Sequence, residues 1–204
     1  MWRCDLNKPC VKFCESKKDK ASCGMQYKGR NMIEILERLR IWREERGLDK
    51  IEFDLDVQAS FIFEEIGVEN LRLKTPEGKI DSLCDATVFS INALALIPGG
   101  IQYMIENFKY ICDSKYTVSI LLNEALELLD PLSDIQCHFR NIIVIAKGMI
   151  VNMGYDYEKS MQETLKEIES RKGVFNPESG KWEKFKDEES KKLWYKADYS
   201  KCKL

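Results

Sequence analysis

The spacing of hydrophobic residues follows a helical period along most of the chain, after a first segment that has none. In residues 31–47, apolar side chains recur at intervals of three and four, which is typical of an amphipathic helix. Asn31 can cap the start of this helix, and Gly47 can end it. Residues 1–30 are polar and lysine-rich, and we interpret them as an appendage.

Two further helices are expected before residue 100. The first of them begins at Asp49 or Asp54 and runs to about Arg72. A linker over 73–79 follows, because its proline and glycine are helix breakers. The next helix spans Ile80–Ile97 and ends at a Pro-Gly-Gly sequence.

The helical pattern continues to about residue 172 and then changes. Further helices are predicted, with Ser133 or Asp134 as the cap of the third: 101–112, 117–130, 133–154 and 156–172. Apolar pairs on either side of Asn-Pro-Glu-Ser-Gly then favour a small β-hairpin. The sequence therefore predicts an all-α protein, an antiparallel helical bundle over 31–172 with an irregular or β-hairpin extension over 173–204.

Paired acids occupy two successive predicted helices. Glu65 and Glu69 are four residues apart, as are Asp81 and Asp85, so each pair shares one helix face. If the two helices pack antiparallel, four carboxylates point toward one place, and a cation is needed to keep them ionised. Oxygen ligands of this kind suit Mg²⁺ or Mn²⁺. This pattern predicts a divalent-metal site for a nucleotide polyphosphate.

The alternative is that these acids belong to a solvated helix surface. The second acidic helix is apolar almost all round from Leu83 to Ile97, with Asp85 and Asn92 as exceptions. A helix of that composition is normally buried, and acids on buried helices are rarely unpaired. The composition therefore favours the metal site.

The acidic segments resemble the all-α nucleoside triphosphate pyrophosphohydrolases, the group of MazG-like proteins, phosphoribosyl-ATP pyrophosphohydrolases and dimeric dUTPases. The family signature is a Glu-Glu-x-x-Glu helix followed by a Glu-x-x-Asp helix with an apolar run. FEEIGVEN matches the first helix through Glu64 and Glu65, and DSLCDATVFSINAL matches the second through Asp85. The remaining family acids would fall on Val68 and Ser82, each one residue from an acid of this chain. The segments SRKG and KADY also resemble the ends of phage-type relatives.

This resemblance implies a bundle that hydrolyses nucleoside triphosphates to monophosphate and pyrophosphate with Mg²⁺. Carboxylates such as Glu65, Glu69, Asp81 and Asp85 would hold the metal, and Glu64 or Glu65 would orient or deprotonate the attacking water. The first helix of the family helps to wall the base pocket, which makes Trp42 a candidate contact. Family members assemble as dimers or tetramers, so a homo-oligomer is expected.

Other side chains are candidates for substrate binding. Asn92 lies two helical turns beyond Asp85 and could bond a base or sugar, or could be a satisfied core residue. Four basic residues are candidates for phosphate oxygens, with solvated surface bases as the alternative: Lys147, Arg171, Lys172 and Lys196. The single histidine, His138, has no second histidine for zinc chemistry and is interpreted as structural.

Four of the eight cysteines crowd the start of the chain, at Cys4, Cys10, Cys14 and Cys23. Their spacings match no standard zinc or iron–sulfur motif, although four soft ligands could still close a structural Zn²⁺ site. Reduced thiols on a leader are the alternative. The cysteines at 84, 112 and 137 lie in or beside apolar runs and are expected to pack as small hydrophobic residues.

Composition and charge narrow the range of possible functions further. A net charge of −2 argues against non-specific nucleic-acid binding, and no apolar run is long enough to cross a membrane. The first residues lack the apolar core of a signal peptide, so a cytoplasmic location is expected. Two other functions stay open: a non-catalytic helical binding or regulatory protein that uses its cysteine-rich leader, and a zinc-dependent nucleic-acid adaptor.

Overall fold

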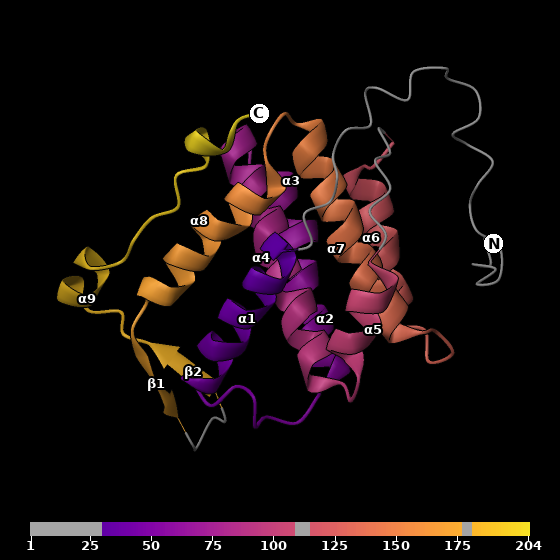
Figure 1. Ribbon diagram of the computed structural model, residues 1–204, viewed down its shortest axis with the longest axis horizontal. Coiled ribbons are helices and arrows are strands. Elements are labelled where there is room, and N and C mark those ends of the chain that lie inside the picture. Colours follow the sequence, from indigo (N-terminus) through magenta and orange to yellow (C-terminus); the bar gives the residue numbers. More distant parts are fainter. Residues whose placement is uncertain (1–29, 109–114, 177–180) are drawn as a thin grey trace. The chain divides into compact units, whose positions relative to one another are not determined.

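A computed structural model of the chain describes residues 30–108, 115–176 and 181–204 (Figure 1). Contacts divide the chain into two units, Met1–Arg30 and Asn31–Leu204, and nearly all of the described residues belong to the second. This second unit is mostly helical and carries a two-stranded antiparallel sheet near its C-terminus. The predicted all-α class with a hairpin extension is thereby confirmed. Across the described ranges, no helix is both long and apolar enough to span a membrane.

Helix α1 (Arg30–Glu44) ends as its sequence predicts. Gly47 adopts a φ of 66°, a left-handed conformation that favours glycine. The amide of Leu48 donates to the carbonyl of Arg43 at 2.9 Å, and the amide of Gly47 donates to the carbonyl of Glu44 at 3.1 Å. These two bonds form a Schellman motif, which satisfies the last carbonyls of the helix.

The second predicted helix is continuous but contains one wide turn. It comprises α2 (Leu55–Phe63), the π-helical turn η1 (Glu64–Glu69) and α3 (Asn70–Arg72). Its cap is Asp54 rather than Asp49, since an Asp54 carboxylate oxygen accepts the amide of Val57 at 3.1 Å.

Helix α4 (Pro76–Leu96) begins at Pro76, earlier than the predicted Ile80. Proline is accepted in a first helical turn because the amide it lacks would have no partner there. Thr75 caps the helix by accepting the amide of Gly78 at 3.2 Å. What the sequence suggested as a linker is therefore largely a helix start.

The remaining helices of the bundle follow the predicted order. They are α5 (Gly100–Asn107), α6 (Val118–Glu127), α7 (Ile135–Asn152) and α8 (Tyr157–Ser170). The caps of the last three are Thr117, Asp134 and Asp156, each of which accepts an amide of its own first turn. For α7, this settles the predicted choice between Ser133 and Asp134.

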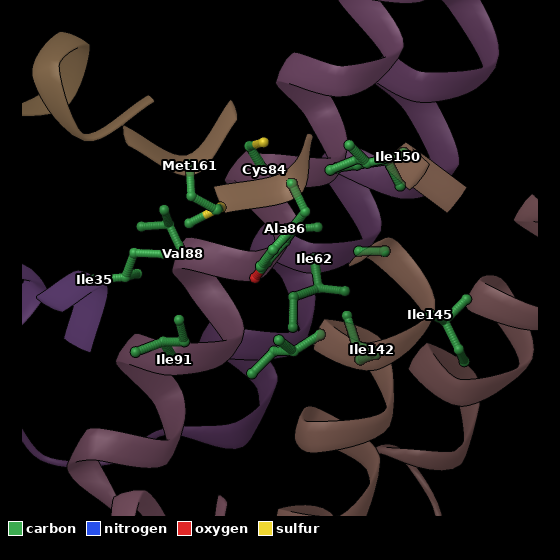
Figure 2. Close-up of a cluster of buried hydrophobic side chains, with 14 of the residues drawn as sticks. Ile35, Ile62, Cys84, Ala86, Val88, Ile91, Ile142, Ile145, Ile150 and Met161 are labelled. Carbon is green, nitrogen blue, oxygen red and sulfur yellow. The ribbon is translucent and has the colours of Figure 1, made fainter. Parts of the chain in front are cut away.

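Helix α4 is the centre of the bundle, because α2, η1, α5, α7 and α8 all pack against it. Figure 2 shows side chains of the core that come from several helices, including Ile35 of α1, Ile62 of α2 and Met161 of α8. The α4 residue Ile91 and the α7 residue Ile142 are fully buried in the same core. The prediction that α4 is buried is confirmed, so its acids are carried on the innermost helix of the fold.

The C-terminal extension contains more structure than was predicted. Strands β1 (Gly173–Asn176) and β2 (Lys181–Lys184) pair antiparallel, with Phe175 opposite Trp182. Helix α9 (Glu188–Lys192) and the 3₁₀ turn η2 (Tyr199–Cys202) follow, and neither was expected. The hairpin lies beside the C-terminal ends of α1 and α8, whereas the end of the chain lies near the start of α8 (Figure 1).

Candidate functional site

The π turn explains where the acids of the first helix lie. The amide of Asn70 donates to the carbonyl of Glu65, a bond between residues five apart that adds about one residue to the turn. Because this turn is one residue longer, Glu69 takes the position along the helix axis, relative to Glu64, that residue 68 would take in a regular α-helix.

Ser82 stabilises this turn from the neighbouring helix. Its hydroxyl donates to the carbonyl of Glu65 at 2.7 Å, and its side chain is buried. A carbonyl in a widened turn is less well hydrogen-bonded within its own helix, and the Ser82 hydroxyl gives it a second donor. Ser82 therefore links the wide turn to α4, one residue from Asp81.

Three carboxylates form what we call the acidic cluster: Glu65 of η1 and Asp81 and Asp85 of α4. Burial raises the pKa of Glu65 to about 7, assisted by the charges of Asp81, Glu64 and Glu69. Burial first, and then the charges of Asp81 and Glu65, raise the pKa of Asp85 well above its ordinary value. The carboxylates therefore lie close enough to repel one another.

Asp81 has an additional partner from the end of the chain. The hydroxyl of Tyr199 donates to its Oδ1 atom at 2.7 Å. Burial raises the pKa of Asp81, while the Tyr199 bond and the charges of Arg171 and Lys196 oppose that rise. Asp81 is thus positioned by a hydrogen bond.

The acidic cluster matches the chemistry of a hard dication only in part. Its oxygens are of the right type for Mg²⁺ or Mn²⁺, and a bound cation would remove the mutual repulsion that raises the pKa values. Within the described ranges, however, no three or more histidine, cysteine or acidic side chains converge as a ready metal-binding group. The carboxylates are neighbours without forming a closed coordination shell.

A cavity of about 750 Å³ opens beside Asp85. It is bounded by α1, α2, α4 and α8, and by the hairpin with the residues after it. Its lining side chains are Trp42, Phe61, Asp85, Val88, Phe89, Asn92, Ile168, Arg171, Trp182, Glu183, Lys184 and Lys186. The cavity is large enough for a nucleotide-sized ligand.

A second cavity, of about 500 Å³, adjoins the first and is mainly apolar. Both are lined by Trp42, Phe61, Phe89, Asn92 and Trp182, and we call this shared region the aromatic cleft. The rings of Phe61 and Phe89 stack with their centroids 4.9 Å apart. Flat apolar walls of this kind suit the ring of a nucleobase.

Positive charge gathers at the end of the cavity near Asp85. Arg171 of α8 and Lys184 and Lys186 of the extension line it, and we call these three residues the cationic wall. Burial, followed by the charges of Arg171 and Lys186, lowers the pKa of Lys184. One cavity therefore presents two carboxylates, those of Asp85 and Glu183, with three cations and aromatic side chains.

Two of the predicted substrate contacts lie in this cavity on the α1 and α4 sides. Trp42 is oriented by its indole nitrogen, which donates to the carbonyl of Ile168 at 3.2 Å. The Oδ1 atom of Asn92 accepts from Arg43 at 3.1 Å, which leaves its amide nitrogen for a ligand or water. The sequence left open whether Asn92 faces a ligand, and the structure places it on the cavity surface.

The four basic residues that were predicted to bind phosphate lie in different places. Arg171 lines the cavity and pairs with Glu167, whereas Lys172 and Lys196 are exposed and do not line it. Lys147 is buried on α7 and bonds Glu158 at 2.6 Å. Of these four bases, the structure brings only Arg171 to the cavity.

The sequence analysis missed several side chains of this region. Trp182, Lys184 and Lys186 are separated from the acids by about a hundred residues, and alternation along a short strand was the only available signal. Besides burial, the charge of Glu167 contributes to the raised pKa of both Asp81 and Asp85, and Glu167 was not among the predicted site residues. The four-residue spacing of Glu167 and Arg171 indicates only that they share a helix face. It does not indicate that α8 packs against α4.

The cysteines and the histidine lie apart from this site where they are described. Cys84 and Cys137 are buried, as predicted, and Cys202 is buried as well. His138 contacts Glu124 at 2.8 Å between α7 and α6, which agrees with a structural role. The remaining cysteines lie outside the described residues, namely Cys112 and the proposed zinc ligands Cys4, Cys10, Cys14 and Cys23.

Searches of protein-family models, of curated proteins and of solved structures each gave no match for this chain.

Proposed function

We propose that the chain is a Mg²⁺- or Mn²⁺-dependent nucleoside triphosphate pyrophosphohydrolase of the MazG-like type. The observation that carries this proposal is the composition of one cavity, which is lined by Asp85, by the cationic wall and by the aromatic cleft. Phosphates require cations or metals, and a base requires flat apolar surfaces. The family resemblance of the two acidic helices supports the same reaction.

The acidic cluster would hold the metal in this scheme, with Glu69 close by on the π turn. A dication bound there supplies positive charge to the phosphate oxygens as the bond is broken. The cationic wall binds the phosphate chain from the other side of the cavity, and the aromatic cleft holds the base. Cleavage between the α and β phosphates is what the resemblance implies.

Activation of water falls to a carboxylate that the metal leaves free. Glu64 is exposed at the start of the π turn, and Glu65 is partly buried with a pKa near neutrality. A base whose pKa lies near the working pH transfers protons efficiently. Glu64→Gln and Glu65→Gln variants compared at saturating Mg²⁺ would separate the two roles.

The direct test is pyrophosphate release from a panel of nucleoside triphosphates with Mg²⁺, and again with a chelator. We expect release with Mg²⁺ only, and its loss in Asp85→Ala and Glu65→Ala proteins that keep their circular dichroism spectra. Glu127→Ala, on the exposed side of α6, is the matched control and should retain full activity. An active Asp85→Ala protein would remove Asp85 from the metal ligands.

A non-catalytic nucleotide-binding protein is the second candidate. It is favoured by the bond from Tyr199 to Asp81, which already engages one oxygen of the acidic cluster. Tight nucleotide binding without pyrophosphate release, at any Mg²⁺ or Mn²⁺ concentration, would support this candidate over the enzyme. Self-association as a dimer or tetramer stays a prediction, to be measured by light scattering.

A further inference from the structure

The hairpin β1–β2 is fixed against the bundle by a stacked arrangement of side chains. The guanidinium of Arg46 lies 4.9 Å from the ring centroid of Trp42 and 5.0 Å from that of Trp182. Arg46 is only 8% exposed, and its Nη2 atom donates to the carbonyl of Arg171 at 3.2 Å. A desolvated cation between two indole rings is a strong contact, so the position of β2 is defined by α1.

Strand β2 contributes consecutive residues to the cavity lining, Trp182, Glu183 and Lys184. Trp182 and Lys184 are two residues apart, so they project from the same face of β2, and both line the cavity that contains Asp85. Gly173, opposite Lys184, makes this possible. A Cβ atom there would lie 2.3 Å from the carbonyl oxygen of Glu183 and 2.5 Å from the Trp182 ring.

The lysines of the cationic wall form no close ion pair among the described residues, although the charges of Asp85 and Glu167 act on Lys184. Across 30–108, 115–176 and 181–204, neither Lys184 nor Lys186 forms an ion pair with a carboxylate. Lys184 instead lies 5.6 Å from the ring centroid of Trp194, and burial together with Arg171 and Lys186 lowers its pKa. Lys184 and Lys186 are exposed at the cavity, and cations gathered in one place are stabilised by an anion that binds between them.

The cavity also carries acidic side chains, those of Asp85 and Glu183. Asp85 lines the cavity together with Lys184, and its charge acts to raise the pKa of Lys184, although the two form no close ion pair in the described part of the chain. A ligand that fills this space meets both carboxylates and ammonium groups. A polyphosphate that carries a dication would suit both, because the carboxylates would hold the metal and the lysines would bind the free phosphate oxygens.

We propose that the hairpin is the phosphate-binding arm of the site, with Lys184 as its principal contact, Arg171 and Lys186 beside it, and Trp182 closing the aromatic cleft. This inference rests on the proposed function for the identity of the substrate. It goes beyond that function by assigning binding to an extension outside the helical bundle and outside the acidic motifs.

Binding of inorganic tripolyphosphate with Mg²⁺, measured by calorimetry on the full chain, tests this inference without any hydrolysis assay. We expect Lys184→Met to weaken binding about tenfold or more, and Lys184→Met with Lys186→Met to weaken it further. Lys192→Met is the matched control, because Lys192 is exposed on α9 and does not line the cavity. Its affinity should equal that of the unmodified protein, and the melting temperatures of all variants should agree.

Trp182 is tested with a nucleotide in place of tripolyphosphate. Trp182→Leu should weaken binding of a non-hydrolysable nucleoside triphosphate several-fold more than it weakens binding of tripolyphosphate, because only the nucleotide carries a base. Equal tripolyphosphate affinity in the unmodified and Lys184→Met proteins, or no tripolyphosphate binding at all, would overturn the inference. Failure of the proposed function has a different signature, namely tripolyphosphate binding that depends on Lys184 without pyrophosphate release from any nucleotide.

Discussion

The hydroxyl of Tyr199, in the 3₁₀ turn η2, donates a hydrogen bond of 2.7 Å to Oδ1 of Asp81 on the central helix. Tyr199 is buried and also contacts the hydroxyl of Thr164 at 2.9 Å. Its place is therefore fixed by α8 as well as by α4. This turn, far from Asp81 in the sequence, positions an acid of the candidate site and is part of it.

Replacement of Tyr199 by phenylalanine should affect metal binding more than folding. Burial raises the pKa of Asp81 and the bond to Tyr199 opposes that rise, so loss of the bond favours the protonated acid and weakens the metal site. We expect the Mg²⁺ concentration for half-maximal activity to rise roughly tenfold, and stability to fall by about 1–2 kcal/mol. Titration of activity with Mg²⁺ and urea unfolding measure the two effects.

Tyr195→Phe is the control for this substitution. The hydroxyl of Tyr195 also donates to an acid, Glu163, but Glu163 does not line the cavity beside Asp85. This variant should lose some stability and keep the Mg²⁺ dependence of the unmodified protein. Identical Mg²⁺ curves for the two variants would mean that Tyr199 is structural only.

Asp85→Asn should abolish hydrolysis and make the metal-free protein more stable. Burial and the charges of Asp81 and Glu65 raise the pKa of Asp85, so the ionised acid is disfavoured in the fold near neutral pH. A neutral amide of the same shape removes that penalty, and we expect a gain of about 1 kcal/mol at pH 7. Urea unfolding in a chelating buffer measures it, and a destabilised variant would contradict the assigned electrostatics.

The stability of the metal-free protein should also depend on pH through Glu65. Its pKa is raised to about 7 in the fold, so between the ordinary value of 4.5 and about 7 the folded state binds more protons than the unfolded state. The free energy of unfolding must then fall as pH rises through this window, and level off above it. Because Glu65 is partly exposed, the expected loss is on the order of 1 kcal/mol.

Saturating Mg²⁺ should remove this dependence, because a bound cation favours the ionised acid. Unfolding curves at pH 5, 6, 7 and 8, with and without Mg²⁺, make the comparison, and Glu65→Gln should show a flatter profile without metal. A free energy of unfolding that rises from pH 5 to pH 7 in the metal-free protein would be evidence against a raised pKa at Glu65.

Gly173→Ala should act on the site from outside the bundle. A methyl group there meets the Trp182 ring and the carbonyl of Glu183, so β2 has to shift away from β1. We expect nucleotide affinity to fall several-fold while the melting temperature of the bundle changes little, because the core lies elsewhere. Fluorescence titration measures the affinity, and Val174→Ala, at an exposed position of the same strand, is the control.

The local features of this fold were predictable and its long-range contacts were not. Gly47, Asp134 and the hairpin signal act within a few residues of themselves, so periodicity and capping rules located them. Docking of Trp182 on Arg46 and bonding of Tyr199 to Asp81 join segments more than a hundred residues apart. Such contacts depend on how helices pack, which a single sequence does not specify.

In the candidate site, too, the local features were predictable and the long-range contacts were not. The acids of the second and third predicted helices were identified because i,i+4 spacing is a local signal and the connection between the helices is short. Lys147 was a plausible phosphate contact by charge alone, but its helix turns it toward Glu158. The π turn escaped detection because the sequence EEIGVE carries no proline or other evident cause of a wide turn.

Deletion of Val68 tests whether the π turn accounts for the displaced acid. Val68 is 55% exposed, so its loss removes little buried surface. Without it the helix can continue with regular α-helical bonds, Glu69 moves to the third acidic position of the family signature, and the residues after it keep their places. We expect the ΔVal68 protein to fold, to melt at the same temperature or higher, and to retain hydrolysis within about threefold of the unmodified rate.

Deletion of Ser60, exposed in the regular part of α2, is the control for the deletion of Val68. It should abolish activity, because removing one residue from a regular helix rotates one end of that helix relative to the other by about 100°. Circular dichroism and pyrophosphate release, measured on both deletion proteins, separate folding from catalysis. Loss of activity in a correctly folded ΔVal68 protein would show that the wide turn itself is required, because the acid would then be in register and still fail to support hydrolysis.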